Sequence, residues 1–154
     1  RRGIIAIGID LSLGIVELAE RNKKKSGLGS TLFPIVNAVD LPFPDNFFDY
    51  ASISLALHEK ERATRDRIIS EMKRMTKKGG ALIFIDFGPP LPRNLYGYLA
   101  GTMEFIAGGE HHRYFKDYIK QGGLEVILEK NQLFEEKRDY RQNILMAIIK
   151  VGNA

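Results

Sequence analysis

The sequence predicts an α/β fold with a largely parallel sheet, and two observations support this. The first is a pair of short, almost unbroken apolar runs, residues 3–10 and 81–87, each of which ends at or next to a carboxylate. Such runs are typical of strands buried on both faces of a parallel sheet. The second is that amphipathic segments alternate with the apolar ones, in the order strand–helix–strand–strand–helix–strand.

The first forty residues read as strand, helix and strand. The apolar run 3–10 is followed by residues 11–22, whose spacing predicts an amphipathic helix that Ser12 can cap. Residues 33–39 are short and apolar enough to form a second strand. Residues 40–46 contain two prolines, which fix φ and remove backbone donors, so we expect a rigid loop there.

The next forty residues repeat the pattern. Residues 48–57 predict a third strand, and 59–77 predict a charged helix with one apolar side. We expect the pair Gly79–Gly80 to end this helix, because glycine is a poor helix former. Residues 81–87 then form the fourth buried strand.

The pattern changes after residue 88. Residues 88–92 contain three prolines and predict a stiff linker, and the aromatic-rich segment 94–107 is expected to be helical. Residues 114–121 predict a short helix that Gly122–Gly123 ends.

Two further strands are expected near the end of the sequence, at residues 124–130 and 143–151. The polar stretch 131–142 separates them. Because a parallel pair needs a crossover connection of about a dozen residues or more, usually a helix, this pair is expected to be antiparallel.

Composition narrows the class of protein. The chain has 154 residues, so we expect residues 1–154 to form a single domain. There is no Cys, which excludes disulfides, thiolate metal sites and a cysteine nucleophile, and three His are too few to indicate a His-built metal site. No apolar run approaches the roughly 20 residues that span a bilayer, and nothing indicates export, so the expected location is cytoplasmic. A net charge of +4 permits an anionic partner without requiring one.

Four motifs in order resemble one family. They are residues 7–12, 37–49, 54–58 and 71–80. Together they are similar to class I S-adenosylmethionine-dependent methyltransferases, most of all to the small-molecule enzymes of the ubiquinone/menaquinone-biosynthesis kind (methyltransferase type 11). The resemblance covers nearly the whole chain and weakens after Pro92. It implies a Rossmann-like sandwich with strand order 3-2-1-4-5-7-6 and an antiparallel last strand.

The chain departs from the family's pattern at its start. Members begin with a strand and a glycine-rich loop that holds the methionine part of the cofactor, whereas here Arg1 directly precedes the match to the second strand. The first strand is therefore lacking in the sequence shown. A sheet without it would have two edges with unpaired backbone groups, so we expect the sequence to be an N-terminally incomplete fragment of a longer domain.

The resemblance implies that S-adenosylmethionine is the cofactor. Asp10, with Leu11 beside it, ends the strand that would hold the ribose hydroxyls. The same geometry serves nicotinamide dinucleotides, and Asp10 has the alternative of capping a helix. Asn37 and Ala38 match the positions that contact the adenine. Asn37 has the alternative of a strand-end turn residue, and Asp40 could take its part.

Ser54 and Leu55 lie near the end of the third predicted strand, and they match the part of the family that meets the methionine end of the cofactor. Ligands in open α/β sheets bind at the carboxyl ends of the strands. A plain buried strand without ligand contacts is the alternative.

Methyl transfer needs alignment of the nucleophile with the methyl group and exclusion of water, and it needs a base only where a proton must leave. The candidate bases are His58, just past that strand, and His111, which His112 follows in the segment 91–121. This segment is expected to cover the substrate side as a lid. Structural or solvent-exposed histidines are the alternative reading of both positions.

Aromatic side chains could form the wall of an apolar substrate pocket or could simply pack in the core. They are Phe43, Tyr96, Tyr98, Phe105, Tyr114 and Phe115.

The expected function is transfer of a methyl group to an O, N or C nucleophile of a small molecule. A non-catalytic binding module with the same fold is the first alternative, and the lack of the glycine loop favours it. A nicotinamide oxidoreductase is disfavoured by the expected antiparallel strand pair. An RNA methyltransferase is disfavoured because the basic residues alternate with acidic ones instead of forming a stripe. The oligomeric state cannot be inferred from the sequence.

Overall fold

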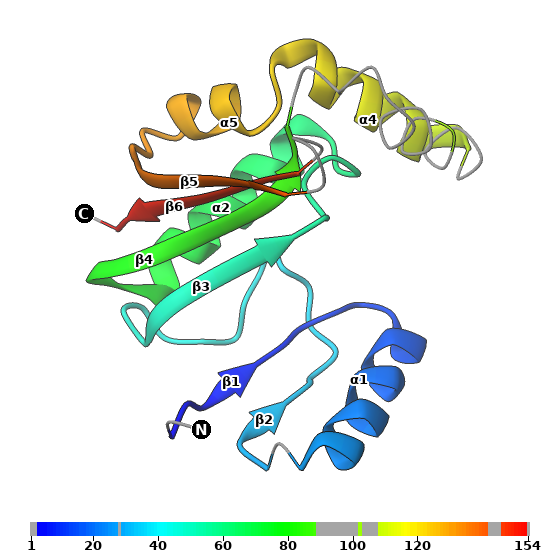
Figure 1. Cartoon of the computed structure of the whole chain (residues 1–154), viewed down its shortest axis with the longest axis vertical. Helices are drawn as coiled ribbons and strands as arrows, with labels where there is room; N and C mark the ends of the chain where they lie inside the picture. Colours follow the sequence, from blue (N-terminus) through cyan, green and yellow to red (C-terminus); the bar gives the residue numbers. More distant parts are fainter. Residues whose placement is uncertain (1–2, 28, 89–101, 103–107, 142–145, 154) are drawn as a thin grey trace. The chain divides into compact units, whose positions relative to one another are not determined.

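The computed structural model describes residues 3–27, 29–88, 102, 108–141 and 146–153. The chain divides into two compact units, Arg1–Phe43 (unit 1) and Pro44–Ala154 (unit 2). Figure 1 shows the elements of each. Part of the expected lid, residues 91–101 and 103–107, lies outside the described residues.

Unit 1 is a strand–helix–strand crossover. Strand β1 (Ala6–Ile7) pairs in parallel with β2 (Thr31–Leu32), and an isolated bridge joins Asp10 to Ile35. Helix α1 (Leu13–Ser26) connects them. The predicted order is confirmed, but the predicted bounds 33–39 were wrong, because β2 ends at Leu32 and only Ile35 of the predicted strand takes part in a bridge. The first strand is also shorter than its apolar run.

Local signals fix the ends of α1. The Ser12 hydroxyl accepts a hydrogen bond from the Ile15 amide, as the sequence predicts. At the other end, Gly27 adopts a left-handed conformation with φ of +65°, and its amide donates to the Lys23 carbonyl. The last turn is rich in lysine, whose charge suits a helix C-terminus. The helix therefore runs four residues beyond its predicted end at Asn22.

Unit 2 is built on a four-stranded mixed sheet in the order β3-β4-β6-β5. Its strands are β3 (Phe48–Ser54), β4 (Thr76–Phe87), β5 (Glu135–Arg141) and β6 (Met146–Gly152). Strand β3 is parallel to β4, and β6 is antiparallel to both β4 and β5. In the strand count that the resemblance implies, the two sheets have the orders 3-2 and 4-5-7-6, so the predicted fold class and the antiparallel last strand are confirmed.

The connection from α2 to β4 differs from the prediction. Helix α2 (Arg62–Met75) ends at Met75 and β4 begins at Thr76, so Gly79–Gly80 does not end the helix. The two glycines lie in β4, next to a register shift in its pairing with β3. A side chain on Gly80 would place its Cβ 2.6 Å from the carbonyl oxygen of Asp49. Close approach of two backbones, rather than helix termination, is the reason for glycine there.

The prediction for residues 124–130 was wrong. They form a helix, α5 (Leu124–Lys130), directly after α4 (Gly109–Gln121). The buried side chains Leu124, Ile127 and Leu128 follow the i, i+3, i+4 spacing of a helix. The strand that pairs with β6 is β5, which lies in the stretch expected to be a polar connection.

The core of unit 2 joins the sheet to α2, α4 and α5. Side chains with at most 4% exposure come from all of these elements: Ile68, Ile69, Met72, Leu82, Phe84, Phe115, Tyr118, Leu124, Leu128, Ile149 and Val151. Among the described residues, no helix combines the length and apolar character needed to cross a membrane.

Candidate functional site

Asp10 lies where the first strand of unit 1 passes into α1. Its carbonyl accepts a hydrogen bond from the Val36 amide, and its Oδ1 accepts one from the Ser12 amide at 2.8 Å. Within the part of the chain that the structure describes, no hydrogen bond to Oδ2 is found, and the residue is half-buried. The carboxylate can therefore cap the helix entry with one oxygen and accept from a ligand hydroxyl with the other. Leu11 beside it is exposed.

Asn37 forms a turn after the second strand of unit 1. Its Oδ1 accepts from the Val39 amide at 3.2 Å, and its carbonyl accepts from the Asp40 amide at 3.1 Å. This is the turn geometry that the sequence offered as the alternative role. The exposed side chain still has a second lone pair on Oδ1 and its amide donors for a ligand. Ala38 is half-buried, and Asp40 is exposed.

Ser54 is the last residue of β3 in unit 2, Leu55 follows it, and both are exposed. The amide of Leu55 donates to the Ile85 carbonyl at 2.8 Å. Leu55 has a φ of +52°, in the left-handed region that a leucine seldom adopts. The chain thus turns sharply as it leaves the sheet, at the carboxyl ends of β3 and β4, where ligands bind in folds of this class.

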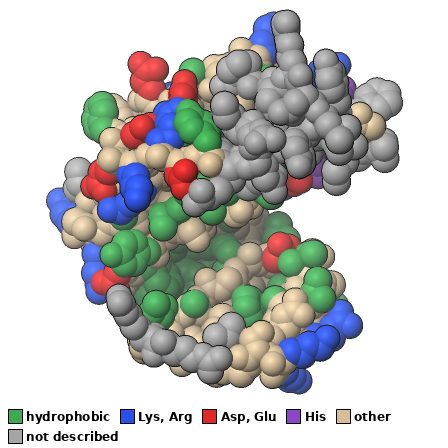
Figure 2. Space-filling view, viewed as in Figure 1, with side chains coloured by type: hydrophobic (Ala, Val, Ile, Leu, Met, Phe, Trp, Pro, Cys, Tyr) green, Lys and Arg blue, Asp and Glu red, His purple; other side chains and the backbone are tan. Residues whose placement is uncertain are grey.

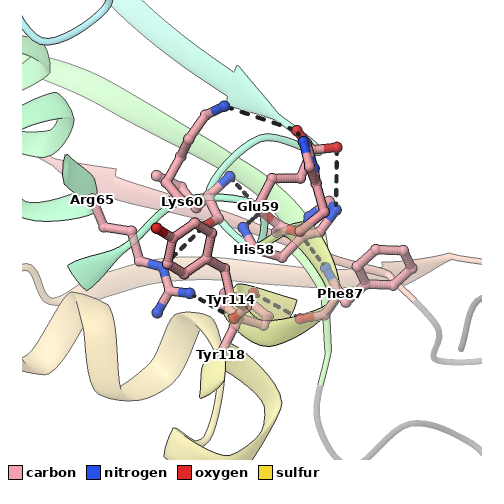
Figure 3. A network of polar contacts seen from close by, with 10 residues as sticks. His58, Glu59, Lys60, Arg65, Phe87, Tyr114 and Tyr118 are labelled. Atoms are coloured by element: carbon pink, nitrogen blue, oxygen red, sulfur yellow. Dashed lines mark hydrogen bonds and ion pairs between the residues drawn. The ribbon is translucent and has the colours of Figure 1, made fainter. Parts of the chain in front are cut away.

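His58 and Asp86 form a buried pair, and Figure 3 labels the His58 side chain of this pair. The His58 Nδ1 lies 2.6 Å from Asp86 Oδ1. Asp86 Oδ2 also accepts from the amides of Leu57 at 3.1 Å and His58 at 3.3 Å, and Oδ1 accepts from the Phe87 amide at 2.8 Å. Asp86 is 1% exposed. A carboxylate buried this deeply is stable only because it is fully hydrogen-bonded.

The His58 ring is enclosed by aromatic rings. It makes edge contacts with Phe87, Phe115 and Tyr118, with centroids 4.8, 5.8 and 6.3 Å away. Its Nε2 lies 3.8 Å from a carboxylate oxygen of Glu59, and the side chain is 3% exposed. This position favours the structural alternative over proton transfer to a substrate, because a base must reach the proton that it removes.

Arg65 of α2 connects the same loop to α4, as Figure 3 shows. Its guanidinium donates to the carbonyls of Leu57 at 2.9 Å and Tyr114 at 3.0 Å, and it lies 3.5 Å from Asp117. Arg65 is 2% exposed. Burial lowers its pKa from the usual value, and the charge of Asp117 opposes this effect.

Tyr118 completes the aromatic surround of the buried pair. The Arg65 guanidinium lies over its ring, 5.3 Å from the centroid. Its hydroxyl donates to the Phe87 carbonyl at 2.9 Å, and burial raises the pKa of this phenol far above its usual value. The phenol is therefore a fixed hydrogen-bond donor.

His111 lies in the first turns of α4 and is exposed. Its Nδ1 is 4.0 Å from Glu59 Oε2, so Glu59 stands next to both predicted bases. An open hollow is formed here by side chains of α4 and of the segment before and within α2: Glu59, Lys60, Glu61, Thr64, Glu110, His111 and Tyr114. His112 is half-buried. The described residues contain no group of side chains suited to hold a metal ion.

The aromatic residues proposed to line a substrate pocket differ in their surroundings. Phe115 is buried against His58 and belongs to the core, whereas Tyr114 lines the hollow. Phe43 is half-buried at the end of unit 1. Three further members, Tyr96, Tyr98 and Phe105, lie outside the described residues.

Comparison with known proteins identifies the family. The family profile described as a methyltransferase domain matches residues 1–84. Demethylmenaquinone methyltransferase of Geobacillus kaustophilus is 34% identical over 91 residues, which are 59% of this chain and 37% of that protein. The ubiquinone/menaquinone biosynthesis C-methyltransferase of Yersinia pestis is 41% identical over 113 residues, 66% of this chain and 43% of that protein. The chain thus spans about two fifths of the length of these relatives.

Solved structures share the fold at low sequence identity. A S-adenosylmethionine-dependent methyltransferase from Methanosarcina mazei superposes with a TM-score of 0.67 and 23% identity, covering 96% of this chain and 81% of that one. Geranyl diphosphate C-methyltransferase from Streptomyces coelicolor gives a TM-score of 0.65 at 12% identity, covering 99% and 63%. Because the family profile matches more than half of the residues, the chain belongs to the methyltransferase domain family.

Proposed function

We propose that this chain takes part in methyl transfer from S-adenosylmethionine to a small-molecule acceptor. S-adenosylmethionine is the cofactor of this family of proteins, and the observation that supports its use here is the state of Asp10. The carboxylate stands at the end of the first parallel strand with one oxygen engaged by its own helix entry, while the other remains open to a ribose hydroxyl. Asp10 and Leu11 would hold the ribose, and Asn37 and Ala38 the adenine.

The finer proposal concerns the acceptor. One relative is named a demethylmenaquinone methyltransferase and another a C-methyltransferase of ubiquinone and menaquinone biosynthesis, so we propose a ring carbon of a small aromatic quinol as the nucleophile. In such a reaction the ring carbon forms a bond to the methyl group, the sulfur–methyl bond breaks, and a proton then leaves the ring carbon. The protein has to align the two reactants and exclude water, and a base assists the loss of the proton.

His111 fits the base role better than His58 in the described structure. It is exposed beside Glu59, whereas the ring of His58 is enclosed. Ser54 and Leu55 would present backbone groups to the methionine end of the cofactor. A His111→Ala variant that loses turnover at unchanged cofactor affinity would support this assignment.

Calorimetry of the full-length protein with S-adenosylhomocysteine tests the proposal. We expect binding of this product and no binding of NAD. Asp10→Asn keeps the shape but removes the charge, and it should weaken binding about ten- to a hundredfold, the usual effect of losing a charged hydrogen bond. Glu17→Gln on the exposed part of α1 is the matched control and should leave binding unchanged.

Three outcomes separate the alternatives. Binding of NAD in place of S-adenosylhomocysteine would contradict the proposal and favour an oxidoreductase. Binding of S-adenosylhomocysteine without turnover of any quinol would favour the non-catalytic module. If the Asp10→Asn variant binds S-adenosylhomocysteine as tightly as the wild type does, the proposed contact of Asp10 with the cofactor is contradicted.

A further inference from the structure

The loop that follows β3 is held in a conformation that it would not choose by itself. Leu55 has a φ of +52°, which costs of the order of 1 kcal/mol or more for a residue with a branched side chain. The side chain is 42% exposed, so burial of apolar surface gives little in return. The surrounding structure must therefore impose this backbone geometry.

Three sets of hydrogen bonds to the interior of unit 2 hold the backbone of this loop. The Leu55 amide donates to Ile85 in β4. Two residues on, the Asp86 carboxylate accepts the consecutive amides of Leu57 and His58 and also contacts the His58 ring nitrogen. Arg65 then donates to the Leu57 carbonyl from the other side. Both charged side chains are at most 2% exposed, so water does not compete for these bonds.

The outward side of the same loop is open. Ser54 and Leu55 are exposed at the carboxyl end of β3, while the residues that hold them are buried beneath. A fixed backbone with exposed groups above and a satisfied polar network below is a preorganised binding surface, which saves the ligand the cost of ordering it.

We propose that Asp86 and His58 are positioning residues for the cofactor. Asp86 fixes the backbone of Leu57 and His58, the residues that follow the exposed Ser54 and Leu55, before the cofactor arrives, and His58 acts by donating its Nδ1 proton to Asp86, not as a base. This inference rests on the proposed function, since it assigns a cofactor contact to the exposed face of the loop.

Substitution of His58 separates the positioning role from the base role. His58→Asn keeps a nitrogen donor near the place of Nδ1 and should bind S-adenosylhomocysteine within about threefold of the wild type. His58→Ala removes the donor to a buried carboxylate and should weaken binding about tenfold or more. Asp86→Asn should act in the same direction. If His58 is a base instead, both His58 variants bind normally and both lose turnover, which overturns the inference.

Asp66→Asn is the matched control. Asp66 is a carboxylate of α2 that pairs with Lys130 of α5 and with Asn131, which follows that helix. It should lower stability slightly and leave the affinity for S-adenosylhomocysteine unchanged. Binding is measured well below the unfolding temperature of each variant, so that a loss of affinity is not a loss of folded protein.

Amide exchange on the wild type tests the same point without a variant. The amides of Leu57 and His58 should be protected from exchange equally with and without S-adenosylhomocysteine, because the network exists before binding. Protection that appears only with the ligand would overturn the inference. Failure of the wild type to bind S-adenosylhomocysteine would overturn the proposed function and this inference together, whereas normal binding by His58→Ala and Asp86→Asn would overturn this inference alone.

Discussion

The two units of the chain are stabilised in different ways. Unit 2 buries side chains from three helices and three strands, and residues far apart in the sequence join its elements. In unit 1, helix α1 buries none of its residues, and hydrophobic side chains stand on the surface, as the lower part of Figure 2 shows. They include Ile4, Ile5, Leu13, Ile15, Leu18, Leu32 and Ile35, each at least 48% exposed.

Both units contain a strand–helix–strand pattern. The difference shows that the ends of its helix can be fixed by neighbouring residues or by contacts with distant residues of a core. The ends of α1 depend on Ser12 and Gly27, which lie next to the helix in sequence. The end of α2 depends on Asn153, whose side-chain amide reaches the carbonyls of residues 73, 76 and 77. Stability should therefore respond to core substitutions in unit 2 and to local ones in unit 1.

The largest effect is expected from the core. Phe84→Ala removes a fully buried ring from β4 and should lower the free energy of unfolding by about 3–5 kcal/mol. Leu18→Ala in α1 removes a side chain that is 48% exposed, and it should cost about 1 kcal/mol or less. Chemical denaturation of the two variants measures both values. A cost for Leu18→Ala as large as that for Phe84→Ala would contradict the comparison, since it would show that α1 is buried in the folded protein.

An intermediate effect is expected from the two helix ends. Asn153→Ala leaves three backbone carbonyls without their side-chain donor in a mostly buried place and should cost about 1–3 kcal/mol. Ser12→Ala removes one capping bond of 3.5 Å and should cost about 0.5–1 kcal/mol. Thermal unfolding followed by circular dichroism compares them. Equal costs would mean that the long-range cap is no stronger than the local one.

The smallest effect is a pH dependence. A hydrogen bond from Arg62 holds the pKa of Asp117 below its ordinary value of 3.8. The carboxylate form is therefore favoured in the folded state, and its contribution is present above pH 3.8 and lost as the pH falls through the lowered pKa. Because both side chains are partly exposed, we expect less than about 1 kcal/mol.

Denaturation at pH 7 and at about pH 3 measures this contribution, with Asp117→Asn as reference. The stability difference between wild type and variant should shrink at the lower pH. This pair joins α2 to α4, whereas the pair of Lys23 and Glu20 in unit 1 lies within one helix. A difference that stays constant with pH would show that the α2–α4 ion pair makes no contribution.

Most of the fold followed from hydrophobic patterning, and the failures at residues 124–130 and in β5 have physical reasons. Residues 124–130 contain Val and Ile in a short apolar run, and periodicity over seven residues separates a strand from a helix poorly. Strand β5 reads Glu-Glu-Lys-Arg-Asp-Tyr-Arg, without any apolar alternation. It is an edge strand that pairs on one side with β6, and charged side chains are usual at sheet edges, so its sequence resembles a loop.

Candidate site residues at the ends of strands could be chosen from the sequence, whereas the contact between His58 and Asp86 could not. Asp10 closes the apolar run 3–10, and Ser54 lies near the end of the predicted strand 48–57, which ends at Ser54 in the structure. The contact of His58 with Asp86 joins residues 28 positions apart, and the sequence shows each separately without showing that they meet. The acid at the end of the buried β4 run was the signal that could have indicated it, since a buried carboxylate must find donors.

The position of Asp86 has a consequence for exchanging parts between relatives. The backbone of residues 57 and 58 is held by a side chain on another strand, so these two residues and Asp86 have to be exchanged together. If residues 57 and 58 were grafted into a relative without an acid at the position of Asp86, the amino acids would be transferred but their backbone conformation would not. Across many homologous sequences, these distant positions should vary together.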